Sequence, residues 1–251
     1  MPVFTVRRLA AVAVVCAAVT VGAQSTSLPA AATLFRRHVE AIGGVAAYRA
    51  IKSVRARGQI ELPAQQIAGN IEILSARPNR LVTRIIMPAI GKIEAGYDGK
   101  VGWSTSAISG PELLDGRRLL EAADDAWFDG TLHEADRVRQ ATTLARADFD
   151  GRPAYKVRVV LTSGGEQTEY FDVETGFHVG TEASRATAQG VVPVVSVFRS
   201  YERFGAIMEP TVAIQRALGF EQVVTLTSRE FDIVTDDVFV PPASVLALAP
   251  R

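Results

Sequence analysis

The chain has 251 residues with 27 basic and 27 acidic side chains, so its formal net charge is zero. This balance gives no long-range attraction to nucleic acid or to anionic lipid headgroups, and we expect no nucleic-acid partner. The single cysteine, Cys16, lies in an apolar segment near the start. The rest of the chain therefore has no disulfides, no thiol nucleophile and no cysteine-bound zinc.

Residues 1–23 have the pattern of a secretory signal peptide. Arg7 and Arg8 precede an uncharged apolar run that ends in small residues at Ala23. The run is shorter than the roughly 20 residues of a membrane-spanning helix, so we expect cleavage after Ala23 rather than an uncleaved anchor. The sequence thus predicts a periplasmic protein whose residues 24–251 form one domain, with no stable transmembrane anchor after cleavage.

Two segments have helical periodicity. In residues 31–50, apolar side chains recur at helical spacing around charged ones, and Gly43-Gly44 interrupts them. This pattern predicts two helices, or one helix with a break. Residues 111–128 have a similar amphipathic pattern, which predicts one helix inserted between two runs of strands.

Most of the remaining chain alternates apolar and polar residues with a period of two, which is typical of half-buried strands. The clearest runs are residues 54–62, 67–73, 81–87, 155–161 and 191–198. Glycine-containing turns, such as Asp98-Gly99, separate several of them and favour antiparallel hairpins. We expect a mainly β protein of the α+β type: a single curved antiparallel sheet, an unclosed β-barrel of about ten or eleven strands.

Such a sheet must cover its apolar face. The predicted helices are too few to cover about ten strands, so a cavity for an apolar ligand is expected beneath them. Each buried CH₂ of an alkyl chain would contribute about 0.8 kcal/mol to binding. The alternative is an ordinary sandwich whose core is filled by its own side chains.

Several motifs then occur in an order that resembles LolA-type periplasmic lipoprotein carriers. Arg77-Pro78-Asn79 precedes a strand that ends in Met87-Pro88, and Asp98-Gly99 is followed by Trp103. A second segment, residues 171–177, is similar to the Phe-Asp-x-x-Thr-Gly hairpin of these proteins. The resemblance is best over residues 54–103. It implies an unclosed β-barrel, helices that plug its mouth, and a lipid or lipoprotein acyl chain as the ligand.

The resemblance and the apolar patterns together give candidate ligand-binding residues. Arg77 matches an arginine that tethers the helical lid in such carriers; alternatively, it only stabilises a turn. The candidates for the cavity wall and the lid are Ile60, Leu62, Ile71, Ile73, Ile85, Met87, Trp103, Leu113, Leu114, Leu119, Leu120, Trp127, Tyr155, Val157 and Val159. For Trp103 and the leucines, permanent packing in a core is the alternative.

No motif in the sequence indicates catalysis. The three histidines, His38, His133 and His178, fall in a predicted helix, a linker and a strand, without the spacing of a metal site. We expect no catalytic residues, no metal and no cofactor, and the protein is not predicted to be an enzyme. Two alternatives remain open: a module on the same fold that binds an envelope protein partner or senses stress, and a hydrolase with an unrecognised site.

Overall fold

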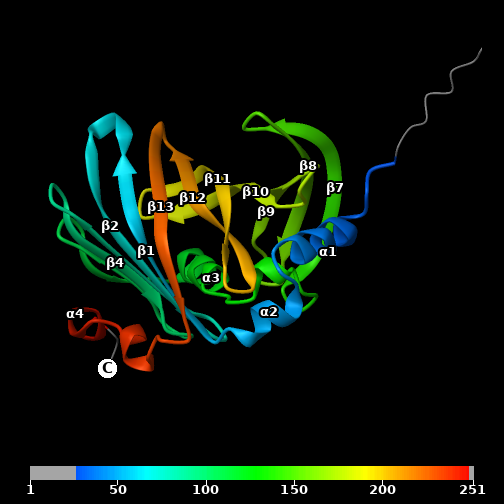
Figure 1. Ribbon diagram of the computed structural model, residues 1–251. Coiled ribbons are helices and arrows are strands. Elements are labelled where there is room, and N and C mark those ends of the chain that lie inside the picture. Colours follow the sequence, from blue (N-terminus) through cyan, green and yellow to red (C-terminus); the bar gives the residue numbers. More distant parts are fainter. Residues whose placement is uncertain (1–26, 249–251) are drawn as a thin grey trace, which may run out of the picture.

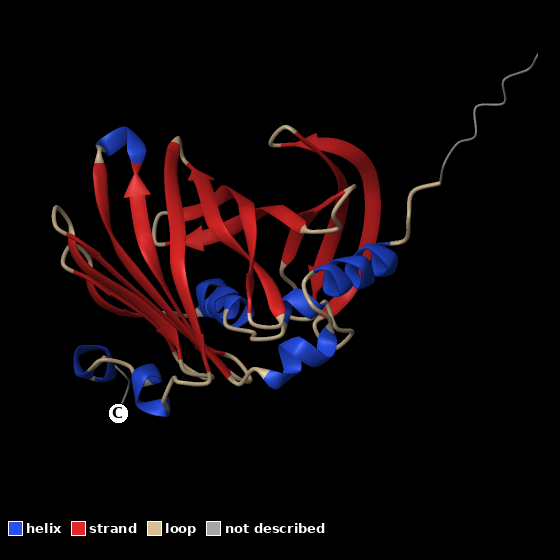
Figure 2. Ribbon diagram, viewed as in Figure 1, coloured by secondary structure: helices blue, strands red, loops and turns tan. Residues whose placement is uncertain are grey.

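Thirteen antiparallel strands form one continuous sheet in residues 27–248, the part of the chain that the computed structural model describes (Figures 1 and 2). The predicted signal peptide and Cys16 lie outside these residues. The strands are β1 (Ser53–Leu62), β2 (Ile67–Ala76), β3 (Arg80–Met87), β4 (Gly91–Tyr97), β5 (Gly102–Ser106), β6 (Gly110–Leu113), β7 (Val138–Phe149), β8 (Arg152–Leu161), β9 (Glu166–Asp172), β10 (His178–Thr187), β11 (Gly190–Phe204), β12 (Ile207–Ala217) and β13 (Phe220–Phe231).

The sheet curves but does not close. Its strand order is β6-β5-β4-β3-β2-β1-β13-β12-β11-β10-β9-β8-β7, so β6 and β7 are two free edges. All neighbours are consecutive in the chain except β1 and β13, which pair with Val54 opposite Phe231. The predicted class, a mainly β protein with one unclosed antiparallel sheet, is confirmed, although the strands number 13 rather than ten or eleven.

Four α-helices and three 3₁₀ turns accompany the sheet. They are α1 (Ala31–Ala41), α2 (Val45–Ala50), α3 (Gly116–Asp125), α4 (Ala243–Leu246), η1 (Pro63–Gln65), η2 (Gly130–Leu132) and η3 (Asp236–Phe239). The predicted break at the glycine pair is confirmed, because α1 ends before Gly43 and α2 begins after Gly44. Gly43 has φ of +118°, and a Cβ there would lie 2.4 Å from the carbonyl oxygen of Ala206, so only glycine fits. None of the helices described is long and apolar enough to cross a membrane.

The inserted helix is shorter than the sequence predicted. It begins at Gly116 instead of residue 111, because residues 110–113 extend the sheet as β6, with Leu113 opposite Trp103. Pro111 is compatible with this edge strand, where one side of the backbone needs no ladder hydrogen bond. An amphipathic spacing of leucines does not distinguish a short edge strand from the first turn of a helix, so the sequence pattern placed the boundary too early.

The two faces of the sheet pack against different parts of the chain. On the concave face, which holds α3 in Figure 1, Ile60, Ile71, Met87 and Val224 form a buried cluster. On the outer face of β2–β5, Leu74, Val82 and Trp103 pack against Phe239 and Val245 of the C-terminal segment. Both faces of this half of the sheet are therefore apolar, and only the concave one faces α3.

Candidate ligand-binding site

Helix α3 lies within the curve of the sheet (Figure 1). Two hollows border the helix and the segment that follows it. No residue of α3 is fully buried. Asp125, at its C-terminal end, lines both hollows, so the two adjoin there. The concave side is thus divided into two parts with different chemistry.

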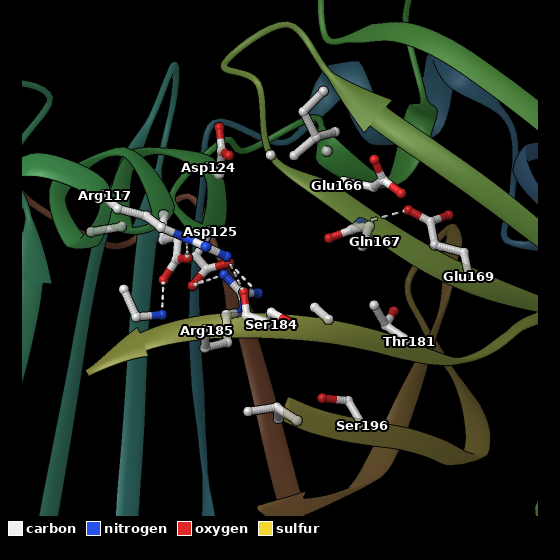
Figure 3. A pocket seen from close by; sticks show the side chains of 18 of the residues that line it. Arg117, Asp124, Asp125, Glu166, Gln167, Glu169, Thr181, Ser184, Arg185 and Ser196 are labelled. Atoms are coloured by element: carbon white, nitrogen blue, oxygen red, sulfur yellow. Dashed lines mark hydrogen bonds and ion pairs between the residues drawn. The ribbon is translucent and has the colours of Figure 1, made fainter. Parts of the chain in front are cut away.

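The larger hollow has a volume of about 730 Å³ and a largely polar wall. One row of residues in register crosses the sheet here: Glu169 on β9 is opposite Thr181 on β10, followed by Ser196 on β11 and Gln215 on β12. All four line the hollow, and Figure 3 shows the first three together with Gln167. Inward-facing positions of a curved sheet are usually apolar, and this row is an exception. Its polar side chains need hydrogen-bond partners, because burial of unpaired polar groups is unfavourable.

The other wall of the larger hollow is α3, whose charged side chains hold it against the sheet. Asp124 accepts hydrogen bonds from Arg137 at 2.6 Å and from Ser163 at 2.7 Å. Glu121 accepts from the backbone N–H of Ala186 at 2.9 Å. Asp125 pairs with Arg185 at 2.9 Å, next to Ser184 in Figure 3. We call these contacts the α3 latch.

The smaller hollow has a volume of about 220 Å³ and is mainly apolar. Its sheet wall consists of concave-face side chains of β1–β3 and β13, and its cover is the segment after α3 together with α2. The apolar lining residues are Ile51, Val54, Ala56, Ile73, Leu81, Ala126, Trp127, Phe128, Ile207 and Leu226. At one end, Glu209 accepts a hydrogen bond from the Tyr48 hydroxyl at 2.7 Å and pairs with Arg229 at 2.8 Å. The polar groups at this end are thus largely satisfied by one another.

Arg77 ties the cover of the smaller hollow to the sheet and to α2. Its guanidinium binds both carboxylate oxygens of Asp129, in the segment after α3. It also donates to the carbonyl oxygens of Ile51 at 2.6 Å and Tyr48 at 2.9 Å, and it lies over the Phe128 ring. This geometry suits a tether, although whether Arg77 holds a moving lid stays a prediction.

The three histidines, which the sequence placed in unrelated elements, meet at one end of the larger hollow. His38 comes from α1, His133 follows η2, and His178 begins β10; their ring centroids lie 6.0–6.4 Å apart. Phe35 stacks on His133 at 4.2 Å, and Phe171 stacks on His178 at 5.3 Å. The topology, not the spacing in the sequence, brings these rings together.

The pKa values of the histidines are shifted in different directions because their partners differ. His133 Nε2 lies 2.6 Å from Glu169 Oε2. Burial lowers the pKa of His133, but the Glu169 carboxylate outweighs this effect and raises the pKa above its ordinary value. Burial likewise disfavours the charged form of Glu169, yet the His133 contact lowers the pKa of Glu169 to about 2. Burial and the neighbouring rings lower the pKa values of His38 and His178, so these two are neutral.

Both ring nitrogens of His38 and of His133 have hydrogen-bond partners. His38 Nδ1 accepts from the backbone N–H of His178 at 3.2 Å, so its proton is on Nε2, which donates to the Thr131 hydroxyl at 3.0 Å. His133 has Thr131 O at Nδ1 and Glu169 at Nε2. A general base must accept the proton of the group it activates, and His38 does the opposite. Among residues 27–248, no cluster of His, Asp or Glu is placed to hold a metal ion.

Three of the predicted ligand-binding residues line the hollows: Leu114 the larger one, Ile73 and Trp127 the smaller one. Others lie on the same concave face without lining either hollow. These are Ile60, Ile71 and Met87, which are buried, and Leu62 and Ile85, which pack beside them. Their contact with a ligand stays a prediction.

The remaining predicted residues have other neighbours. Trp103 and Leu113 lie on the outer face beside Phe239. Val157 and Val159 are buried beneath α1, with Tyr155 next to them. On α3, Leu119 approaches Gly102 of β5, where an added Cβ would lie 3.1 Å from its Cδ1, and Leu120 is exposed. The structure therefore brings together only part of the predicted set.

Two features of the site were missed in the sequence: the histidine cluster and the polar row. For the row, a signal was present, since Glu169, Thr181, Ser196 and Gln215 are polar residues at inward-facing positions of their strands. Only the register of the four strands shows that these residues form one row. For the histidines, the sequence contained no such signal.

Solved structures show where this architecture occurs elsewhere. A LolA superfamily protein from Nitrosomonas europaea superposes with a TM-score of 0.56 at 15% sequence identity, over 85% of this chain and 99% of that one. The fold is LolA-like. A DUF1329 family protein from Desulfovibrio piger shares the LolA-like fold, with a TM-score of 0.54 and 13% identity over 83% of this chain and 96% of that one.

At these identities the likeness extends to the fold alone. No family model matches this sequence, and no curated protein is significantly similar to it. The predicted resemblance to LolA-type proteins is therefore confirmed for the LolA-like fold, whereas ligand and lid have to be argued from this chain's own residues.

Proposed function

We propose that the protein is a periplasmic, non-enzymatic carrier or binding protein for a hydrophobic ligand, either a lipid or the acyl chain of a lipoprotein. The observation that carries the proposal is the smaller hollow. Its sheet wall includes Ile73, Leu81 and Leu226, which are only partly buried although they are apolar and face the inside of the sheet. An alkyl chain placed there would remove them from water, at about 0.8 kcal/mol for each CH₂ buried.

The cover of this hollow also suits a ligand that must enter and leave. Trp127 and Phe128 lie over the apolar wall, and α3 precedes them without any fully buried residue. The cover is held mainly by polar contacts, namely the α3 latch and the Arg77–Asp129 pair. Polar contacts can exchange for contacts with water, so opening such a cover exposes less apolar surface than unpacking a core helix would.

The fold and the start of the chain are consistent with this role. A LolA-like fold is shared with the solved structures described above, and residues 1–23 have the pattern of an export signal. The contacts of two histidines support the non-enzymatic part of the proposal, since His38 donates to the Thr131 hydroxyl instead of accepting its proton and both ring nitrogens of His133 have partners.

Filling the smaller hollow tests the proposal. Ser75 lines it, and Ser75→Phe would occupy part of its volume without introducing charge. We expect the wild-type protein to bind a dansyl-labelled fatty acid, measured by fluorescence titration, and to carry lipid when it is isolated from a periplasmic extract and examined by native mass spectrometry. The Ser75→Phe variant should lose both.

The matched control is Thr225→Phe, on the exposed outer face of β13. It adds the same aromatic ring outside the hollow and should bind the probe as the wild type does. The proposal fails if wild-type protein carries no lipid and ignores the probe, or if Ser75→Phe binds as well as Thr225→Phe does.

A further inference from the structure

The larger hollow is built for a different kind of group from the smaller one, and this difference bears on the ligand. All the charged side chains that line it are already in ion pairs. The pairs are Arg117–Glu121, Arg118–Glu112, Arg137–Asp124, Arg158–Glu166, Arg185–Asp125 and His133–Glu169. A charged ligand group would leave water here without meeting a free countercharge, which is unfavourable.

The uncharged polar side chains of the row are better placed to receive a ligand. Ser196 faces the hollow in Figure 3, where no dashed line joins it to another side chain drawn, and Gln215 is opposite it on β12. Gln167 uses its amide N–H on Glu169 at 2.7 Å, which leaves its amide oxygen to accept. These groups offer both donors and acceptors, the combination that hydroxyl and amide groups require.

We propose that the larger hollow binds the uncharged, hydroxyl- or amide-bearing head group of an amphipathic ligand whose alkyl chain occupies the smaller hollow. Asp125 lines both hollows, so a molecule that occupies both would pass this side chain. This inference rests on the proposed function and narrows it: the ligand is an acyl compound with a neutral polar head rather than a free fatty acid or a cationic lipid.

Four amphiphiles, each with a chain of twelve carbons, allow the effect of the head group to be compared. Monolauroylglycerol and dodecyl maltoside have uncharged hydroxylated heads, laurate is anionic, and dodecyltrimethylammonium is cationic. Titration calorimetry below the micellar concentrations should give Kd values about tenfold lower for the two uncharged compounds, as expected for one or two additional neutral hydrogen bonds.

Two uncharged members of the polar row are then removed in the double variant Ser196→Ala, Gln215→Leu. We expect it to bind the uncharged compounds about tenfold more weakly and to bind laurate unchanged. Gln222→Leu is the matched control, because Gln222 continues the same row on β13 opposite Gln215 but is not among the residues lining the hollow. Circular dichroism and thermal melting verify that each variant is folded.

The outcomes separate the two proposals. If the protein binds all four compounds equally, prefers a charged head, or keeps its preference in the double variant, the head-group inference is overturned while the proposed function stands. If it binds none of the four, both fail.

Discussion

Three histidine side chains that share one cluster have pKa values shifted in different directions, because each has a different hydrogen-bond partner. His133 faces the carboxylate of Glu169, whereas His38 and His178 face neutral groups and one another. Burial alone would make all three neutral. The single carboxylate therefore raises the pKa of one ring above those of the other two.

We expect the three imidazoles to titrate separately. The chain contains only three histidines, so each ring gives a resolvable signal in a ¹⁵N NMR titration. The pKa of His133 should lie above 6.5 and those of His38 and His178 below it. In Glu169→Gln, the pKa of His133 should fall below 6.5, because burial is then no longer opposed. Three pKa values close to 6.5 in the wild type would contradict this account.

These shifts also set the sign of the pH dependence of stability. The stability contributed by His133 is fully present below pH 6.5 and is lost as pH rises through its higher folded pKa. His38 and His178 act in the opposite direction, since their lowered pKa values favour unfolding as pH falls below 6.5. Urea unfolding as a function of pH should therefore show that the free energy of unfolding falls at both lower and higher pH. The Glu169→Gln substitution should abolish only the decrease at higher pH.

Helix α3 is fixed by the α3 latch more than by apolar packing. Its most buried contact joins Arg137 and Asp124, whose side chains are 11% and 10% exposed. Arg137 also donates to the Asp124 carbonyl oxygen at 2.9 Å and lies over the Trp127 ring. This arginine thus connects the helix, the segment that follows it and the sheet.

Asp124→Asn should loosen α3 without unfolding the sheet. Loss of the charge-assisted hydrogen bonds should reduce the free energy of unfolding by about 1–3 kcal/mol. In hydrogen–deuterium exchange, residues 116–128 should exchange faster while β1 and β13 stay protected. Glu166→Gln is the control, because Glu166 and Arg158 form an exposed ion pair, which contributes little to stability. Equal exchange of α3 in both variants would show that the latch does not hold the helix.

The elements themselves were predictable where local chemistry decides them. Asp98-Gly99 forms the expected hairpin turn, with Asp98 Oδ1 accepting from the N–H groups of Lys100 and Val101. Alternation of apolar and polar residues located β1, β2, β3 and β8. Alternation could not show which face is concave, and Trp103 was therefore assigned to the cavity although it packs on the outer face.

The whole molecule depends on contacts between distant parts of the chain. The C-terminal segment, η3 and α4, covers the outer face of β2–β5, where Phe239 and Val245 contact the cluster around Trp103. Because this cover comes from the end of the chain, the first half of the sheet acquires its second packed layer only when the last residues dock.

Phe239→Ala should reduce the free energy of unfolding by about 3–5 kcal/mol, since Phe239 is 2% exposed and its removal leaves a cavity beside Trp103. Val240→Ala is the control, because Val240 is 59% exposed and should change stability by less than about 0.5 kcal/mol. Urea denaturation measures both. Binding of a dodecyl ligand should survive in Phe239→Ala, because the substitution lies on the opposite face; a loss of binding in folded protein would show that the two faces are coupled.

The free edges at β6 and β7 have a geometric consequence. In a closed barrel, the number of strands and their stagger fix the radius. Here no hydrogen bonds join the first and last strands of the order, so the width of the interior is set by the twist of each strand pair and by whatever lies between the walls. The width of the interior can therefore differ without the loss of any hydrogen bond between neighbouring strands.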